Sequence, residues 1–335
     1  MTEKKFSRVQ ANLVIGVLIS LSAIILLITF IDGEQVLAAL KQVKLVLLVP
    51  GLLLLILSLF TRAAAARGIL QERVSLWQSF LIINAGYFVN TVLPFRLGEL
   101  SRAFLLMPSG FSFWEALPTV LLERMFDLLF ALSLFFIGLP YVIDFSQGTI
   151  FAYLLAGILL FGIVVLTLIV IKRNWVFSWL EEKSLTASPL LSGLISRLLT
   201  VVKSLTILTD PLRLVKVIIW IFFSWGIALS FQYLLMRAFI PDAKLIWAIF
   251  TLGALALGVS VPSSPGNIGL YEASMTLALS AFGVDQSLAF TYALTSHILS
   301  LSITTVFGSF GLVREGFGLR DVWQFSKQHR EENGL

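Results

Sequence analysis

Long apolar runs recur along this chain of 335 residues, and they constrain its fold more than any other feature. A helix of about 20 apolar residues rises about 1.5 Å per residue, which is enough to cross a hydrocarbon core of roughly 30 Å. Only 13% of the residues are charged, against roughly a quarter in soluble domains. The short alternating segments of a membrane barrel are not seen. We therefore predict an all-α polytopic membrane protein.

The apolar runs divide into uninterrupted and broken segments. The uninterrupted runs, each a predicted span, are residues 12–31, 45–60, 116–143, 150–171, 214–236 and 288–312. Two further apolar regions, 75–106 and 245–283, are interrupted by proline and glycine. Together they predict about eight transmembrane helices or helix pairs, in a single transmembrane domain that covers residues 1–335.

Basic residues indicate the orientation of the chain. The net charge of +5 comes from Lys and Arg in short connections between spans, a pattern that marks cytoplasmic loops rather than nucleic-acid binding. The N-terminus, the segment with Arg62, Arg67 and Arg73, the connection 172–213 and the tail 313–335 are therefore expected in the cytoplasm. Apolar residues at helical spacing make the connection amphipathic, which suits a helix lying on lipid headgroups or one packed on the bundle.

This orientation constrains the two broken regions. Region 75–106 must enter and leave from the cytoplasm, and region 245–283 must enter and leave from the opposite face. Two re-entrant hairpins of this kind would form an inverted repeat, with a first half at about 12–171 and a second half at about 214–312. Discontinuous helices at equivalent places in two such halves are typical of substrate sites in transporters.

The first broken hairpin brings polar groups into an apolar setting. Its candidate substrate-binding residues are Asn90, Pro94, Arg96, Gly98, Glu99 and Arg102. Pro94 and Gly98 predict an interruption, with a new helix near Glu99. Arg96 and Arg102 are then available for a phosphate, because the guanidinium group suits bidentate phosphate recognition. The alternative is an ordinary cytoplasmic loop whose arginines follow the positive-inside rule.

The second broken hairpin has a non-helical stretch, and a new helix is expected around Leu270. Its candidate residues are Pro262, Pro265, Gly266, Asn267, Gly269 and Glu272. Freed backbone amides and a helix N-terminus favour an anion. Glu272 would repel a phosphate unless it pairs with Arg96 or Arg102, and we take this pairing as a hypothesis. A proline turn without function is the alternative.

A third charged group lies inside the predicted span 116–143. Glu123 and Asp127 share a helix face, and Arg124 can reach Asp127 three residues further on. These residues are either a structural ion pair or a gate that partners the arginines of the first hairpin. His297 lies within the last span, either as a proton-relay element or as a buried, hydrogen-bonded imidazole.

The residue inventory argues against other chemistry. The chain has no cysteine and two histidines, so neither a disulfide nor a metal site is expected. No nucleophile can be paired with a base, and no phosphate-binding loop is found. We therefore expect no enzymatic activity and no cofactor.

Three motifs in this order resemble the lysylphosphatidylglycerol synthase transmembrane-region family of flippase-like proteins. They are Pro-x-Arg-x-Gly-Glu-x-x-Arg from Pro94, Glu-Arg-x-x-Asp from Glu123 and Pro-Gly-x-x-Gly-x-x-Glu from Pro265. The likeness covers roughly residues 10–315. The resemblance implies a helical bundle with re-entrant helices in the bacterial inner membrane, and the charge pattern places both termini in the cytoplasm.

Bifunctional members of this family, such as the multiple peptide resistance factor, move an aminoacylated phospholipid between leaflets. They also carry a cytoplasmic aminoacyl-transferase domain, which this sequence does not show after its last predicted span. We therefore expect lipid movement without lipid synthesis.

The leading prediction is a flippase- or scramblase-like translocator whose partner is membrane phospholipid and not nucleic acid. The alternatives are an ion-coupled carrier of a small anion and a non-transporting, lipid-binding partner of a separately encoded lipid-modifying enzyme. The sequence also leaves a homo-oligomer open.

Overall fold

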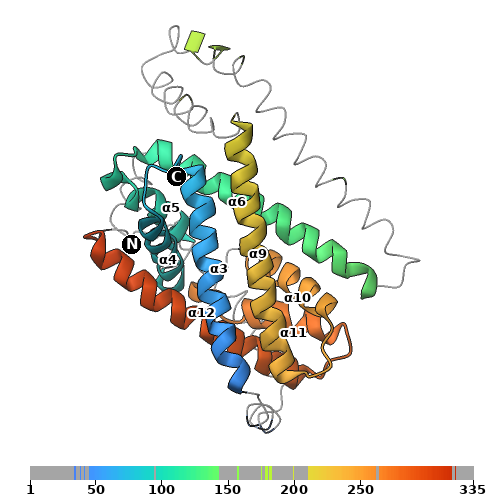
Figure 1. Cartoon of the computed structure of the whole chain (residues 1–335). Helices are drawn as coiled ribbons and strands as arrows, with labels where there is room; N and C mark the ends of the chain where they lie inside the picture. The colour runs from blue at the N-terminus through green and yellow to red at the C-terminus, as the bar shows by residue number, and fades with distance from the viewer. Residues whose placement is uncertain are drawn as a thin grey trace, which may run out of the picture.

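The computed structural model describes most of the predicted bundle. The described stretches are residues 45–93, 96–142, 210–261 and 264–318, with a few isolated residues elsewhere. The spans predicted at 12–31 and 150–171, most of the connection 172–213 and most of the tail lie outside the described residues. Within the described stretches, all regular elements are helices (Figure 1).

The helices fall into two series with the same order. The first series is α3 (Leu48–Ile69), α4 (Leu76–Val92), α5 (Leu97–Leu105) and α6 (Phe113–Gly138). The second series is α9 (Pro211–Phe239), α10 (Leu245–Gly258), α11 (Leu270–Ser280) and α12 (Gln286–Arg314). Short 3-10 turns are η1 (Leu45–Leu47), η2 (Met107–Ser109), η3 (Leu139–Tyr141) and η5 (Pro265–Asn267). Each series therefore consists of a long helix, two shorter helices separated by a break, and a second long helix.

Both predicted interruptions are confirmed as breaks between helices. In the first, α4 ends before Leu93, whose backbone is extended, and α5 starts after Arg96. In the second, α10 ends at Gly258 and α11 starts at Leu270, as expected. Glu99 and Glu272 each lie in the first turn of the helix that follows the break.

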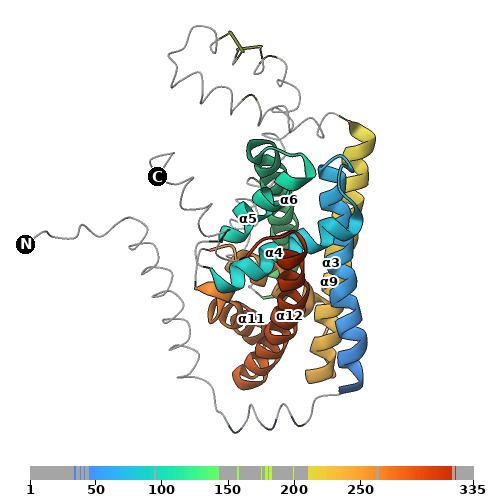
Figure 2. The same cartoon turned by 90° about the vertical axis from the view of Figure 1, so that its left-hand side faces the viewer.

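The two series pack against each other through equivalent helices. Helices α3 and α9 lie side by side (Figures 1 and 2) and run in opposite directions, since Gly68 faces Val217 while Ser58 accepts a hydrogen bond from Ser224 further along α9. Helix α4 packs on α12, and α10 packs on α6 in the corresponding way. The broken pairs α4–α5 and α10–α11 are each in internal contact. Such reciprocity is typical of a repeat related by two-fold symmetry.

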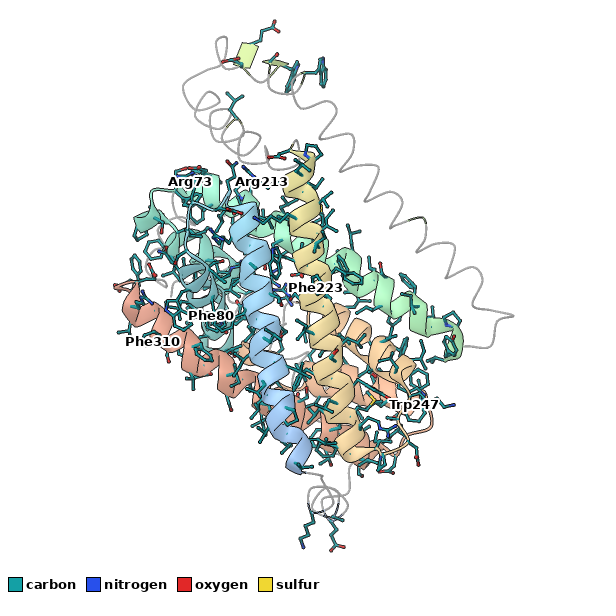
Figure 3. All side chains as sticks on the ribbon, in the orientation of Figure 1. Arg73, Phe80, Arg213, Phe223, Trp247 and Phe310 are labelled. Carbon is teal, nitrogen blue, oxygen red and sulfur yellow. The ribbon has the colours of Figure 1, made fainter. Side chains whose placement is uncertain are left out.

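Both ends of the first broken pair lie at one end of the bundle. Gln78 at the start of α4 donates hydrogen bonds to Ser109, just after α5, at 2.9 Å and to Glu315, after α12, at 3.2 Å. Arg73, between α3 and α4, pairs with Glu115 at the start of α6. Figure 3 shows Arg73 and Arg213 at this end.

The start of α9 joins this same end. Lys216 pairs with Glu72, which follows α3. The hydrogen bond from Lys216 and then its positive charge hold the pKa of the Glu72 carboxyl below its ordinary value.

Both ends of the second broken pair lie at the opposite end of the bundle. Trp247 in the first turn of α10 stacks on Phe282, just after α11, with ring centroids 5.5 Å apart. Leu47 and Leu48 at the start of α3 and Ile240 after α9 pack on the same hydrophobic core. The two broken pairs therefore extend toward each other from opposite ends.

Most predicted spans that fall on described residues are confirmed as helices, but one boundary is wrong. The sequence predicts that the run 45–60 ends before Arg62, because arginine is usual in a loop, whereas α3 continues to Ile69. The physical reason is that Arg62 forms ion pairs with Glu123 and Asp127 of α6, which satisfy its charge inside the bundle. Among the described helices, α3, α9 and α12 are long and apolar enough to cross a membrane.

Candidate functional site

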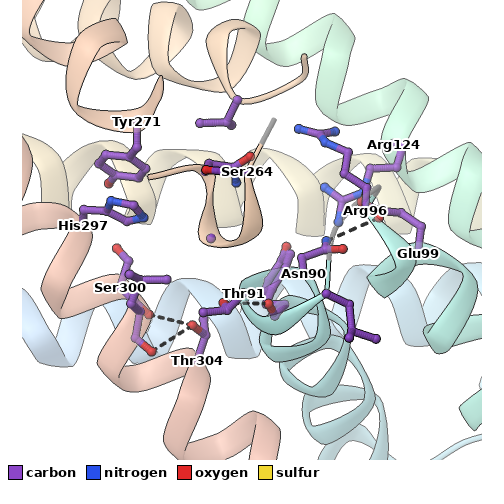
Figure 4. Close-up of a pocket in the computed structure, with 16 residues that line it drawn as sticks. Asn90, Thr91, Arg96, Glu99, Arg124, Ser264, Tyr271, His297, Ser300 and Thr304 are labelled. Carbon is purple, nitrogen blue, oxygen red and sulfur yellow. Dashed lines mark hydrogen bonds and ion pairs between the residues drawn. The ribbon is translucent and has the colours of Figure 1, made fainter. Parts of the chain in front are cut away.

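The two breaks meet at one cavity of about 230 Å³ (Figure 4). The first broken pair contributes Asn90 and Arg96 to its lining, and the second break contributes Ser264, Gly266 and Asn267. Helix α4 also contacts η5 directly. Segments that are far apart in the sequence therefore form one polar site.

A second cavity of about 500 Å³ adjoins the first. Both are lined by Tyr87, Arg96, Glu99 and Arg124, so these side chains lie at their junction. The larger cavity extends to Trp225 on α9 and falls within the roughly 300–1,000 Å³ of small-molecule sites. The junction is the most highly charged part of the cavity lining.

A network of ion pairs supports the junction. Glu123 of α6 pairs with Arg102 of α5 and lies 3.3 Å from Nε of Arg62 of α3. Arg62 also pairs with Asp127, whose carboxylate lies 3.4 Å from Arg124. The predicted contact between Arg124 and Asp127 is confirmed. The network connects three helices through side chains that are largely buried.

The network continues to the cavity wall. The Trp225 indole N–H donates to Asp127 at 3.2 Å, and Nε of Arg124 lies 3.3 Å from Glu99. The Asn90 amide donates to the other oxygen of Glu99 at 3.3 Å. Each carboxylate of the network therefore has at least two partners, as buried charges require.

Arg96 stands apart from this network. It is half-buried and lines both cavities. Within the described parts of the chain, its guanidinium group forms no ion pair or hydrogen bond. Its backbone has φ 53°, in the left-handed region that non-glycine residues rarely adopt. Strained residues of this kind concentrate at functional sites.

The second break has left-handed backbone as well. Gly266 has φ 69°, Asn267 has φ 55° and Gly269 has φ 85°. Gly266 and Asn267 line the cavity opposite the first break. Left-handed backbone from both breaks, at Arg96 and at Gly266 and Asn267, thus lines the same space.

The hypothesis that Glu272 pairs with Arg96 or Arg102 is wrong. One oxygen of Glu272 lies 2.6 Å from Nδ1 of His297, and the other accepts the Gly269 N–H at 2.8 Å. Arg102 is 4% exposed and is held by the ion-pair network. Local geometry decides this pairing, because Glu272 lies in the first turn of α11, which packs on α12.

The predicted site residues separate into those at the cavities and those behind them. The residues that line one or both cavities are Asn90, Arg96, Glu99, Arg124, Asp127, Gly266 and Asn267. The residues that do not are Gly98, Arg102, Glu123, Pro265, Gly269 and Glu272. Pro94 and Pro262 lie outside the described residues.

Some lining residues were not among the predicted site residues. Arg62 and Trp225 line the larger cavity, Ser264 lines the smaller one, and Tyr87 lines both. Of these, only Arg62 has a sequence signal that could have identified it, since an arginine that directly follows a long apolar run can belong to the helix.

Apolar helices of spanning length, with charged side chains gathered around cavities between two broken helix pairs, define a helical membrane protein. More narrowly, the chain belongs to the family of the lysylphosphatidylglycerol synthase TM region, whose model matches residues 13–308. The predicted family resemblance is thereby confirmed. The chain is also similar to a UPF0104 membrane protein of Methanocaldococcus jannaschii, with 23% identity over 227 residues that cover 66% of this chain and 92% of the relative. No solved structure matches this chain.

Proposed function

We propose that this chain binds the phosphate of a phospholipid beside Arg96 and moves the headgroup between leaflets, as a flippase- or scramblase-like translocator. The observation that carries the proposal is the position of Arg96, where the two breaks meet and where no described residue pairs with it. Membership of a family named after a lipid-modifying enzyme supports lipid as the substrate class.

The balance of charge at the junction supports an anionic ligand. The arginines are Arg62, Arg96, Arg102 and Arg124, and the carboxylates of the network are Glu99, Glu123 and Asp127. Among these groups one positive charge is left over, on Arg96, because the other carboxylate near the cavities, that of Glu272, is bound to His297 and does not pair with Arg96. An uncompensated charge in a low-dielectric interior is unfavourable, so a group with one negative charge, such as a phosphodiester, fits this position.

Replacing Arg96 by alanine is expected to slow lipid exchange by roughly 10- to 100-fold, because a charge-assisted contact contributes about 1.5–3 kcal/mol. The measurement is leaflet exchange of fluorescently labelled lipids in vesicles reconstituted with the full chain. Arg96→Lys keeps the charge but not the bidentate geometry, so we expect an intermediate rate.

Arg213→Ala is the matched control, because Arg213 pairs with Asp210 at 3.6 Å and does not line either cavity. It should exchange lipid as the unmodified chain does. Exchange no faster than in empty vesicles, for every headgroup tried, would refute translocation. A rate for Arg96→Ala equal to that of the unmodified chain would refute the role of Arg96.

We also propose that the two broken pairs are re-entrant hairpins that enter a bacterial inner membrane from opposite faces, with both termini in the cytoplasm. The proposal is supported by the clustering of the ends of α4 and α5 at one end of the bundle and of α10 and α11 at the other. Alternating access around a fixed midplane site is a known use of such hairpins.

Cysteine labelling of this cysteine-free chain tests the orientation. Met107 follows α5 and is 39% exposed, and Leu245 starts α10 and is 49% exposed. We expect a membrane-impermeant maleimide to label Met107→Cys only from the cytoplasmic side and Leu245→Cys only from the other side. The unmodified chain is the blank, and labelling of both variants from one side would contradict the arrangement.

A further inference from the structure

Glu272 and His297 form a buried pair outside the arginine network. Nδ1 of His297 lies 2.6 Å from Glu272, and the two side chains are 5% and 6% exposed, respectively. The imidazole also stacks on Tyr271, with ring centroids 4.0 Å apart and planes within 3° of parallel. The ring is therefore held on one edge by a carboxylate and on one face by an aromatic ring.

The pair has access to the cavity that contains Arg96. His297 and Tyr271 both line this cavity (Figure 4). In the described parts of the chain, Nε2 of His297 has no hydrogen-bond partner. A proton can therefore reach the imidazole from the cavity while Nδ1 stays bound to Glu272.

Among the described residues, no other charged side chain forms an ion pair with Glu272 or His297. The charged and titratable groups that share the cavity of this pair are Tyr87 on α4, Arg96 just before α5, Glu99 on α5, Arg124 on α6 and Tyr271 on α11. Arg62 on α3 lines only the adjoining cavity, and Tyr292 on α12 is bonded to Gln232. Helix α9 contributes the neutral Gln232, and α10 has no ionisable side chain. Among the described residues, no arginine or lysine forms an ion pair with Glu272. With a neutral imidazole, the pair therefore carries one negative charge.

Counted beyond the arginine network, this negative charge offsets that of Arg96 over a longer range, although the two side chains form no ion pair. Four arginines face four carboxylates when Glu272 is counted with the network and His297 is neutral. A monoanion bound at Arg96 would leave one negative charge in excess. One proton taken up by the pair would restore neutrality. Binding of the anion and binding of the proton should therefore favour each other, and this coupling is reciprocal.

We propose that the cavity binds its anion together with one proton, and that the Glu272–His297 pair is the proton site. The inference rests on the proposed function, because it takes Arg96 as the anion site. A proton gradient could then drive the anion through the cavity, which would provide the energy coupling of a translocator.

Binding of a soluble phosphodiester tests the proposal on the full chain in detergent. The probe is glycerophosphoglycerol, the deacylated form of a phospholipid headgroup. In weakly buffered solution we expect up to about one proton to be taken up per anion bound. Its affinity should fall with rising pH, by up to about tenfold per pH unit wherever binding takes up one proton. Binding without proton uptake and without a change of affinity between about pH 5 and 9 would overturn the proposal.

Substitutions assign the effect to the pair. Glu272→Gln keeps the shape of the side chain and removes its charge, so we expect its binding of the probe to be independent of pH. Tyr292→Phe is the matched control, since the Tyr292 hydroxyl is bonded to Gln232 and not to the pair. It should keep the proton uptake. Equal uptake by the unmodified chain and by Glu272→Gln would place the proton elsewhere and refute the assignment.

Lipid exchange separates this inference from the proposed function. In vesicles, a pH difference across the membrane should change the exchange rate of the unmodified chain by about tenfold, within the usual range of coupling between two sites. Exchange that is fast but unaffected by the pH difference would refute the proton site and leave translocation standing. Absence of any exchange, with proton-linked binding of the probe intact, would refute translocation and leave the proton site standing.

Discussion

Glu123→Ala is expected to destabilise the folded chain by about 3–5 kcal/mol, because it leaves a buried arginine without its partner. Glu123 is 2% exposed and Arg102 is 4% exposed, and two guanidinium nitrogens of Arg102 face the two oxygens of the carboxylate. The substitution would also leave Nε of Arg62 without the Glu123 carboxylate as its partner. The measurement is denaturant unfolding in detergent micelles, followed by tryptophan fluorescence.

Two comparisons show whether the effect comes from the buried charge. Arg213→Ala removes an ion pair whose side chains are 37% and 45% exposed, so its effect should stay below about 1 kcal/mol. The double substitution Arg102→Met with Glu123→Leu removes both charges together and should recover most of the lost stability. A Glu123→Ala variant as stable as the unmodified chain would show that the pair does not hold α5 on α6.

Gly98→Ala is expected to destabilise the chain by about 3 kcal/mol, because a methyl group at this position has no space. It would collide with the carbonyl oxygen of Gly86 on α4 and approach the side chain of Asn90 within 2.6 Å. The Gly98 N–H also donates to the Asn90 side chain at 2.7 Å. Backbone faces backbone here, so the clash can be relieved only if α5 moves away from α4. Such a shift would also displace Arg96, so lipid exchange should fall together with stability.

Gly226→Ala is the matched control for Gly98→Ala. Gly226 lies inside α9, and a methyl group there would meet no atom within 4 Å. Alanine should therefore stabilise the helix by up to about 1 kcal/mol. If the two substitutions changed the unfolding free energy equally, close packing of α4 on α5 would not be the reason for glycine at position 98.

Local patterns account for what could be predicted from the sequence. Proline and glycine in the two broken regions predicted both interruptions, because these residues end helices through their own backbone chemistry. Arg124 and Asp127 were correctly placed together, because residues three positions apart share a helix face. The first turn of each helix after a break was also located, and with it Glu99 and Glu272.

Contacts between distant segments could not be predicted in the same way. The partners of Arg62 lie more than sixty residues away, and the ion pair with Asp127 spans 65 positions. Hydropathy places Arg62 in a loop, because it depends only on residues that are neighbours in the sequence. The same limitation produced the wrong partner for Glu272, whose contact with His297 spans 25 positions and depends on how α11 packs on α12.

By itself, the sequence determined the helical class, the membrane-spanning apolar character and the positions of the two breaks, because these depend on local backbone preferences and on the partition of side chains into lipid. Only the tertiary structure decided that the two breaks meet at one cavity and that Glu272 pairs with His297. It also decided that Arg102 is buried in the ion-pair network, whereas Arg96 has no ion-pair partner among the described residues. The physical reason is that a buried charge takes whichever partner the packed helices bring within reach, and helix packing sums many weak contacts between segments far apart in the chain.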